Sequence, residues 1–334
     1  AGTKRSVPAM MVSGSMLSVG LQGTAAGDGE LWTCDLASTC TTTAGWTFRG
    51  GDASGTAGQS WNNTTFEAVW TMTARGSNLY IGLGTSAGDA EVWTCDTSAT
   101  CTTTAGWTKL GGDAVNSSWA NATYEEVTAL MWYRGELYAG LGASTGDAEL
   151  WKWNGTNWGS AAVAGDGLNG SWTDSLYERV KGIASYNGDL IVALGDNAAG
   201  EGEVWRYDTN TWSRIGGDGS NSGWTSIIER INALQVYRGK LYVGTGLTVN
   251  TDATIWAYGN NVLVESAATS QDTSWHHLAV TYNGTTLKLF IDGVEGGSVA
   301  TGATMLDTNH PFLLGALAGN VGADRLASGF TGMI

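Results

Sequence analysis

One pattern recurs five times along the 334-residue chain and limits its fold more than any other feature. Each copy has a run that starts with leucine, such as Leu137–Gly142 (LYAGLG), then a short polar loop and a second run that reaches tryptophan, such as Gly146–Trp151 (GDAELW). The copies begin at Leu17, Leu79, Leu137, Leu190 and Leu241, so successive starts are 62, 58, 53 and 51 residues apart. A nearly constant period of this length is typical of propellers and other repeat arrays.

Each period contains two further predicted strands. A run such as Tyr124–Leu130 precedes each core and turns at a pair such as Arg134-Gly135. A second tryptophan opens a short strand after the core, at Trp46, Trp107, Trp158 and Trp212. β-Branched and aromatic residues that alternate with small or polar ones, between clusters of Gly, Asn and Asp, predict hairpins. Four short antiparallel strands per repeat form a propeller blade, so the sequence predicts an all-β fold with a five-bladed β-propeller over residues 1–259.

The fifth copy lacks a clear fourth strand with tryptophan. A circular propeller must close, and we expect the gap to be filled either by the N-terminal residues or by Val262–Val264.

The charge and composition exclude several classes of protein. The formal net charge of −15 argues against nucleic-acid binding, which depends on clustered Lys and Arg. No apolar run approaches 18 residues, so no membrane span is predicted. With 50 glycines and two prolines, the chain has the turn-rich composition of a soluble all-β protein.

The four cysteines form two copies of one pattern. Five residues separate Cys34 from Cys40 and Cys95 from Cys101, which is wider than the usual zinc knuckle, and no histidine lies nearby. In a loop between antiparallel strands this spacing lets the two side chains meet. The sequence therefore predicts two local disulfides and an oxidising, extracellular location, with four reduced thiols as the alternative.

A different pattern begins near residue 260. Trp275–Tyr282 (WHHLAVTY), Asn283-Gly284 and Leu289–Gly293 (LFIDG) follow one another at the spacing of the middle hairpins of laminin-G-like jelly rolls, also called concanavalin-like lectin domains. This resemblance implies a partial jelly-roll β-sandwich over residues 260–334. The family's complete domain is longer, so either the segment folds as a partial sandwich on the propeller or another chain supplies strands at its open edges.

The repeats also resemble five-bladed lectin propellers of the tachylectin type, in blade number, repeat length and tryptophan-rich strands. The likeness implies an architecture and not a set of sites. Each connection between blades pairs an aspartate with a tryptophan: Asp52 with Trp61, Asp113 with Trp119, Asp166 with Trp172 and Asp218 with Trp224. An aromatic face and a carboxylate are the groups that bind a pyranose. A structural role, with turn-forming aspartates and tryptophan wedges between blades, explains the same repetition.

A second set of acids lies two residues apart at the start of a strand, where both side chains point the same way. The pairs are Asp28 with Glu30, Asp89 with Glu91, Asp147 with Glu149, and Glu201 with Glu203. Calcium takes several such oxygen ligands, but a calcium loop gathers three or more acids. We therefore expect solvated carboxylates and no metal or cofactor, with Ca²⁺ as the alternative.

The sequence offers little support for catalysis. The histidines are His276, His277 and His310, all in the segment that resembles a jelly roll, and the acids repeat from blade to blade, whereas glycosidase acids occupy single positions on a central face. The sequence thus predicts a non-enzymatic extracellular protein that binds carbohydrate or another cell-surface ligand. The alternative is a structural subunit of a filament, sheath or virus appendage that self-associates by strand donation.

Overall fold

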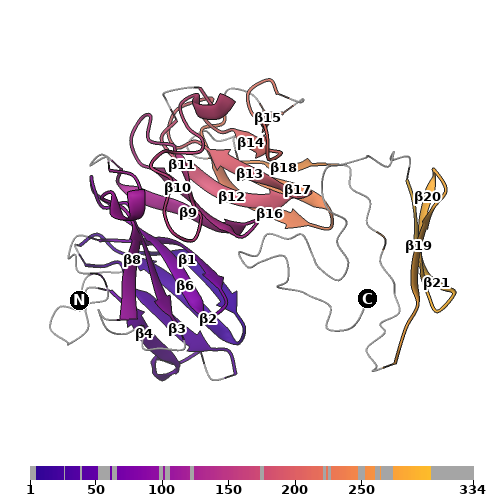
Figure 1. Cartoon of the computed structure of the whole chain (residues 1–334), viewed down its shortest axis with the longest axis horizontal. Coiled ribbons are helices and arrows are strands. Elements are labelled where there is room, and N and C mark those ends of the chain that lie inside the picture. Colours follow the sequence, from indigo (N-terminus) through magenta and orange to yellow (C-terminus); the bar gives the residue numbers. More distant parts are fainter. Residues whose placement is uncertain are drawn as a thin grey trace.

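The computed structural model describes residues 5–25, 27–37, 40–51, 61, 66–97, 101, 106–120, 124–173, 177–220, 223–224, 227–246, 253–259, 264 and 274–301. The fold is all-β, as predicted, and the described residues form six small antiparallel sheets (Figure 1). Among the same residues, 3₁₀ turns at Thr43–Gly45, Val115–Ser117 and Leu168–Gly170 lie between strands. No helix in the described part of the chain is long and apolar enough to span a bilayer.

Each copy of the repeat forms one sheet, whose strands follow in chain order. Sheet one contains β1 (Ser6–Ser13), β2 (Met16–Gln22), β3 (Leu31–Asp35) and β4 (Trp46–Gly50). Sheet two contains β5 (Val69–Arg75), β6 (Asn78–Leu83), β7 (Glu91–Asp96) and β8 (Trp107–Gly111). Sheet three contains β9 (Glu126–Tyr133), β10 (Glu136–Gly142) and β11 (Leu150–Trp153). Sheet four contains β12 (Val180–Tyr186), β13 (Asp189–Leu194), β14 (Val204–Tyr207) and β15 (Trp212–Gly216). Sheet five contains β16 (Ile231–Tyr237), β17 (Lys240–Thr245) and β18 (Ile255–Tyr258).

The hairpins turn where the sequence predicts. Arg134-Gly135, Asn187-Gly188 and Arg238-Gly239 each connect the first and second strands of a sheet, and both residues of each pair have positive φ. Two central residues of positive φ define the type I′ turn, whose twist matches that of the flanking strands.

Successive sheets pack against each other through their first strands. β1 contacts β5, β5 contacts β9, β9 contacts β12, and β12 contacts β16. One apolar cluster fills each of the four junctions. The glycine of the repeat allows this approach, since a Cβ on Gly140 would lie 2.4 Å from Cγ1 of Val180 in the next sheet. Figure 1 shows the sheets following the chain from indigo to orange.

The first candidate for closing the array, the N-terminal segment, is described only from residue 5 onward. Ser6–Ser13 forms β1 and pairs with β2 in sheet one, whereas residues 1–4 lie outside the described residues. The other candidate, Val262–Val264, lies outside the described residues except for Val264. Sheet five has three strands among the described residues.

Both predicted disulfides are confirmed. Cys34 bonds to Cys40 and Cys95 to Cys101, with Cα atoms 5.8 and 5.6 Å apart. Each bond links the end of the third strand to the start of the connection to the fourth, so it fixes the outer edge of sheets one and two.

Replacing Cys95 and Cys101 together by alanine should lower the free energy of unfolding by about 2 kcal/mol, because the bond closes a short loop in the unfolded chain. Urea titration of the wild type and the double variant measures the difference. Reductant should shift the midpoint of the wild type more than that of the variant, and equal shifts would contradict the prediction.

Sheet six contains the segment that resembles a jelly roll: β19 (Leu278–Tyr282), β20 (Thr286–Ile291) and β21 (Val294–Ala300). Its hairpins turn at Asn283-Gly284 and Asp292-Gly293, as the resemblance implies. Figure 1 shows this sheet in yellow, apart from the others.

One face of sheet six is apolar. Strand alternation and register place these residues on it: Leu278, Val280, Tyr282, Leu287, Leu289, Ile291, Val294, Gly297 and Val299. Leu278, Val280 and Val294 are 59, 61 and 70% exposed. The described residues therefore leave this face largely uncovered.

Candidate functional site

The four tryptophans predicted to bind a ligand lie in the core. Trp61, Trp119, Trp172 and Trp224 are 0, 2, 0 and 6% exposed. The indole N–H of Trp119 donates to the carbonyl of Ala90 at 2.7 Å, and Trp172 donates to that of Ala148 at 2.8 Å. Their faces are closed to a sugar ring, so these residues are the wedges of the structural interpretation.

The aspartates paired with them do not converge on the tryptophans. Asp113, Asp166 and Asp218 are exposed, and Asp52 lies outside the described residues. Asp113 forms an ion pair with Lys109 at 2.8 Å. The structure therefore brings none of the three described pairs together as a binding site.

The second acid of each Asp/Glu pair holds a tryptophan of its own strand. Glu30, Glu91, Glu149 and Glu203 accept the indole N–H of the tryptophan two residues later, at 2.6 to 2.8 Å. In the fifth copy the Thr254 hydroxyl accepts from Trp256 at 2.7 Å. Residues two apart in a strand point to the same face of the sheet. The hydrogen bond between the acid and the tryptophan could therefore have been predicted from the sequence.

The first acid of each pair is buried, and in the first and fourth copies it caps the preceding loop. Asp28 Oδ2 accepts the backbone N–H groups of Thr24 and Ala25 at 3.0 and 2.9 Å. Glu201 Oε2 does the same for Asp196 and Ala198, at 2.9 and 3.3 Å. The expectation of solvated carboxylates is thus wrong for these acids, because they satisfy buried donors. Among the described residues, no group of three or more His, Cys, Asp or Glu side chains could hold a metal ion.

At the start of the first strand of each sheet, the side chains differ from one copy of the repeat to the next. Sheets two to five each contain a β-bulge near the start of the first strand, at Trp70, Thr128, Lys181 and Asn232. A bulge redirects a side chain and is common beside active sites. Two residues earlier stand Ala68, Glu126, Arg179 and Arg230. The start of each first strand therefore combines fixed geometry with variable chemistry.

These positions join in what we call the charged cluster: Glu126, Glu178, Arg179, Lys181, Asp196 and Arg230. Arg179 Nε donates to Glu126 Oε2 at 3.0 Å and its Nη1 donates to Asp196. Arg230 Nη1 lies 3.5 Å from Asp196 Oδ1. The side chains of Glu126 and Asp196 are 7 and 2% exposed. The cluster thus connects sheets three, four and five through nearly buried charges.

Burial changes how the cluster titrates. It raises the pKa of Glu126, although Arg179 opposes the change. It also raises the pKa of Glu178, and a hydrogen bond with Asp196 adds to the effect. It lowers the pKa of Lys181, against the attraction of Asp196. Asn197 Nδ2 donates to both Glu178 and Asp196, at 3.1 and 2.7 Å, and so holds the two carboxyl groups together.

The cluster keeps hydrogen-bonding capacity. Arg230 Nε is buried and has no hydrogen-bond partner within the described part of the chain. A buried donor without a partner is costly, and a ligand oxygen would satisfy it. Lys181, on its bulge, makes no hydrogen bond or ion pair with any described residue.

Sequence analysis missed this site because it followed the acids that repeat. Glu126 and Asp196 occupy single positions, and the signal was the variation among Ala68, Glu126, Arg179 and Arg230 at an otherwise regular point of the repeat.

Glu201, next to the cluster, gives a prediction about pH. Burial raises its pKa, so the folded protein holds a proton that the unfolded chain releases, and stability falls as pH rises from about 4.5 through the raised pKa. Glu201→Gln should raise the free energy of unfolding by about 1 kcal/mol at pH 7, since its Oε1 is buried without a partner. At pH 4 the difference should vanish.

Urea titrations at the two pH values measure this effect. Asp218→Asn, on an exposed turn, is the control and should change stability by less than about 0.5 kcal/mol. A Glu201→Gln variant that loses stability at pH 7 would contradict the expected sign.

Comparison with protein families gives one match. Residues 209–334 match the family described as the concanavalin A-like lectin/glucanases superfamily. The matched range begins before the predicted boundary at 260 and takes in β15 and sheet five as well as sheet six. No curated protein matches the chain.

Several solved structures are similar to the chain at low identity. An exo-β-1,3-galactanase from Phanerochaete chrysosporium has 10% identity and a TM-score of 0.43, with 71% of this chain and 55% of that chain covered. A Trypanosoma rangeli sialidase has 12% identity and a TM-score of 0.45, with 75 and 43% covered. An exo-1,5-α-L-arabinanase from a bovine ruminal metagenomic library has 13% identity and a TM-score of 0.40, with 77 and 94% covered. The chain spans less than two thirds of the galactanase and the sialidase, and these likenesses say nothing of its activity.

Proposed function

We propose that the chain is an extracellular carbohydrate-recognition protein that binds its ligand without transforming it. Sheets one to five form the five blades of a propeller, and residues 209–334 contribute a region of the concanavalin-like type. The two disulfides fit an oxidising compartment.

The charged cluster carries this proposal. Carboxylates accept hydrogen bonds from sugar hydroxyls, whereas guanidinium and ammonium groups donate to sugar oxygens. Arg179 holds Glu126 and Asp196 in place, so the acids need no rearrangement when a ligand binds. Arg230 Nε and Lys181 Nζ supply the donors that the described residues leave without partners.

A glycan array probed with the purified chain tests the proposal, followed by calorimetry on the glycan that is retained best. Lys181→Met should weaken binding at least tenfold, since a charge-assisted hydrogen bond is worth about 1.5 to 3 kcal/mol. Lys240→Met, on an exposed position of β17, is the matched control and should bind as the wild type does.

The bound glycan should be recovered unchanged after prolonged incubation. If the wild type releases shorter products and Glu178→Gln does not, the protein hydrolyses the glycan and the proposal of recognition alone is wrong. An array on which no glycan is retained, or equal binding by the wild type and Lys181→Met, would contradict the proposed role of the cluster.

One observation favours a second function, that of a structural subunit. The apolar face of sheet six is of the kind that marks an interface between proteins, and a neighbouring chain would cover it in a filament. Sedimentation velocity separates the two functions. Large assemblies that Val280→Lys dissolves support the subunit, and a monomer of about 35 kDa supports the independent recognition protein.

A further inference from the structure

A cleft of about 310 Å³ lies between sheets three and four. Six of its lining residues matter here: Tyr138, Lys152, Asn169, Tyr207, Asn210 and Trp212. Its volume falls in the range of small-molecule sites, roughly 300 to 1,000 Å³. Tyr138 lies near the start of β10, whereas Gly142 at the end of that strand bridges to Arg179 of the charged cluster. The cleft is therefore a separate site.

Two aromatic rings form one wall of the cleft. Tyr207 and Trp212 stack with centroids 4.9 Å apart and planes at 27°. The buried Trp172 packs edge-on against Trp212 at 5.5 Å, and the hydroxyl of Tyr207 donates to the carbonyl of Thr209 at 3.0 Å. Both rings are half-buried and fixed in place, so a ligand that stacks on them orders no further side chain.

The other lining groups are polar and near the rings. Lys152 is held by Glu136 at 3.1 Å, and Asn169 Nδ2 donates to the carbonyl of Val163 at 3.0 Å, which fixes its amide. Asn210 is exposed at the mouth. Burial raises the pKa of Tyr138 above its ordinary range, so its hydroxyl is a protonated donor at neutral pH. The cleft thus joins an aromatic surface to amide and hydroxyl groups.

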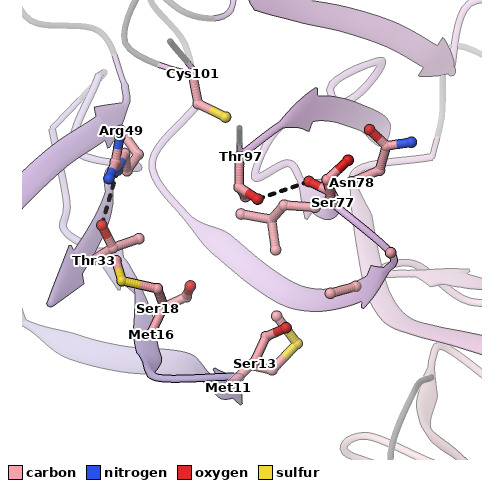
Figure 2. A pocket seen from close by; sticks show the side chains of 13 residues that line it. Met11, Ser13, Met16, Ser18, Thr33, Arg49, Ser77, Asn78, Thr97 and Cys101 are labelled. Carbon is pink, nitrogen blue, oxygen red and sulfur yellow. Dashed lines mark hydrogen bonds between the residues drawn. The ribbon is translucent and has the colours of Figure 1, made fainter. Parts of the chain in front are cut away.

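The equivalent cleft between sheets one and two provides an internal comparison. It measures about 160 Å³, and no aromatic residue stands among the described residues that line it (Figure 2). Ser18 stands where sheet three has Tyr138, since each follows the leucine that opens the repeat, and Thr33 stands where sheet three has Lys152. Arg49 donates to Thr33 Oγ1 at 2.9 Å along the wall of this cleft that sheet one forms. Both junctions therefore have a cleft. Of these two clefts, the one between sheets three and four has aromatic side chains among its described lining residues.

We propose that the cleft between sheets three and four binds a neutral pyranose unit of a glycan. The apolar C–H face of the sugar stacks on the Tyr207–Trp212 wall, and its hydroxyls hydrogen-bond to Asn169, Asn210 and Tyr138. Lys152 is the charged residue among the described lining residues, and its salt bridge with Glu136 neutralises it, which favours a neutral sugar. The inference shares its ligand class with the proposed function but uses none of the residues of the charged cluster.

The test measures retention of the purified chain on an array of neutral hexose and hexosamine glycans, then calorimetry on the best of them. Tyr207→Ala and Asn210→Ala should each raise Kd, by at least tenfold and threefold respectively. Asn210 is exposed, so its variant should fold as the wild type does even if Tyr207→Ala is destabilised. Arg49→Ala and Thr97→Ala, which line the cleft between sheets one and two, are matched controls and should leave Kd within twofold.

The outcomes separate the two sites. Retention lost in Tyr207→Ala and Asn210→Ala but kept in Lys181→Met assigns the neutral sugar to the cleft. Retention lost only in Lys181→Met overturns the cleft and leaves the charged cluster as the binding site. An array without any neutral glycan retained overturns the cleft as well.

Discussion

Arg179→Met is expected to lower the free energy of unfolding by about 3 to 5 kcal/mol at pH 7. Removing one partner of a buried ion pair leaves the other charge without compensation, and here Arg179 neutralises both Glu126 and Asp196. Urea titration followed by circular dichroism measures the loss. The double variant Arg179→Met/Glu126→Met should recover part of it, because it removes one of the two stranded carboxylates.

The surface pair Lys288–Glu295 serves as the control. Its atoms are 2.7 Å apart, but both side chains are well exposed, so Lys288→Met should change stability by less than about 1 kcal/mol. Equal effects of Arg179→Met and Lys288→Met would show that the charged cluster contributes no more to stability than a surface ion pair.

Trp172→Ala is expected to lower the free energy of unfolding by about 3 to 5 kcal/mol, the range for deleting a buried aromatic side chain. Its ring contacts Trp205 and Trp212 edge-on, and its N–H satisfies the carbonyl of Ala148. The variant therefore leaves both a cavity between sheets three and four and an acceptor without its donor. Thermal unfolding should show the loss as a clear decrease in Tm.

Trp275→Ala is the matched control. Because Trp275 is 76% exposed, this substitution should change the free energy of unfolding by less than about 0.5 kcal/mol. The comparison also tests the assignment of Trp172 as a wedge. A Trp172→Ala variant that keeps its stability and loses glycan binding would restore the interpretation of Trp172 and Asp166 as a ligand pair.

The parts of the fold that follow from local sequence could be predicted. The period of the leucine and tryptophan runs gave one sheet per copy, and the two-residue turns at Arg134-Gly135 and Asn187-Gly188 gave the hairpins. The disulfides were predictable because six positions of separation bring two cysteines together across neighbouring strand ends. In each case the signal lies within one repeat.

The charged cluster could not be predicted in the same way, since several of its contacts join different repeats. Arg179 is 53 residues from Glu126, and Arg230 is 34 residues from Asp196. Only the packing of the first strands brings these side chains together. The repetition of the tryptophans was also ambiguous. A tryptophan present in every copy fits a structural wedge and a ligand site equally well, and only its burial in the folded protein distinguishes the two roles.

The β-bulge in the first strand has a consequence for how such a chain diversifies. The bulge leaves one residue of the first strand without a partner in the ladder and shifts the register of the strand pair by one residue. Trp70, Thr128, Lys181 and Asn232 differ in size, charge and polarity, yet the strands around them keep the same arrangement. Duplicated copies can therefore acquire separate chemical roles at this position while the scaffold stays constant, and libraries randomised there should retain folding in a larger share of members than libraries randomised at the neighbouring Val127 and Val180.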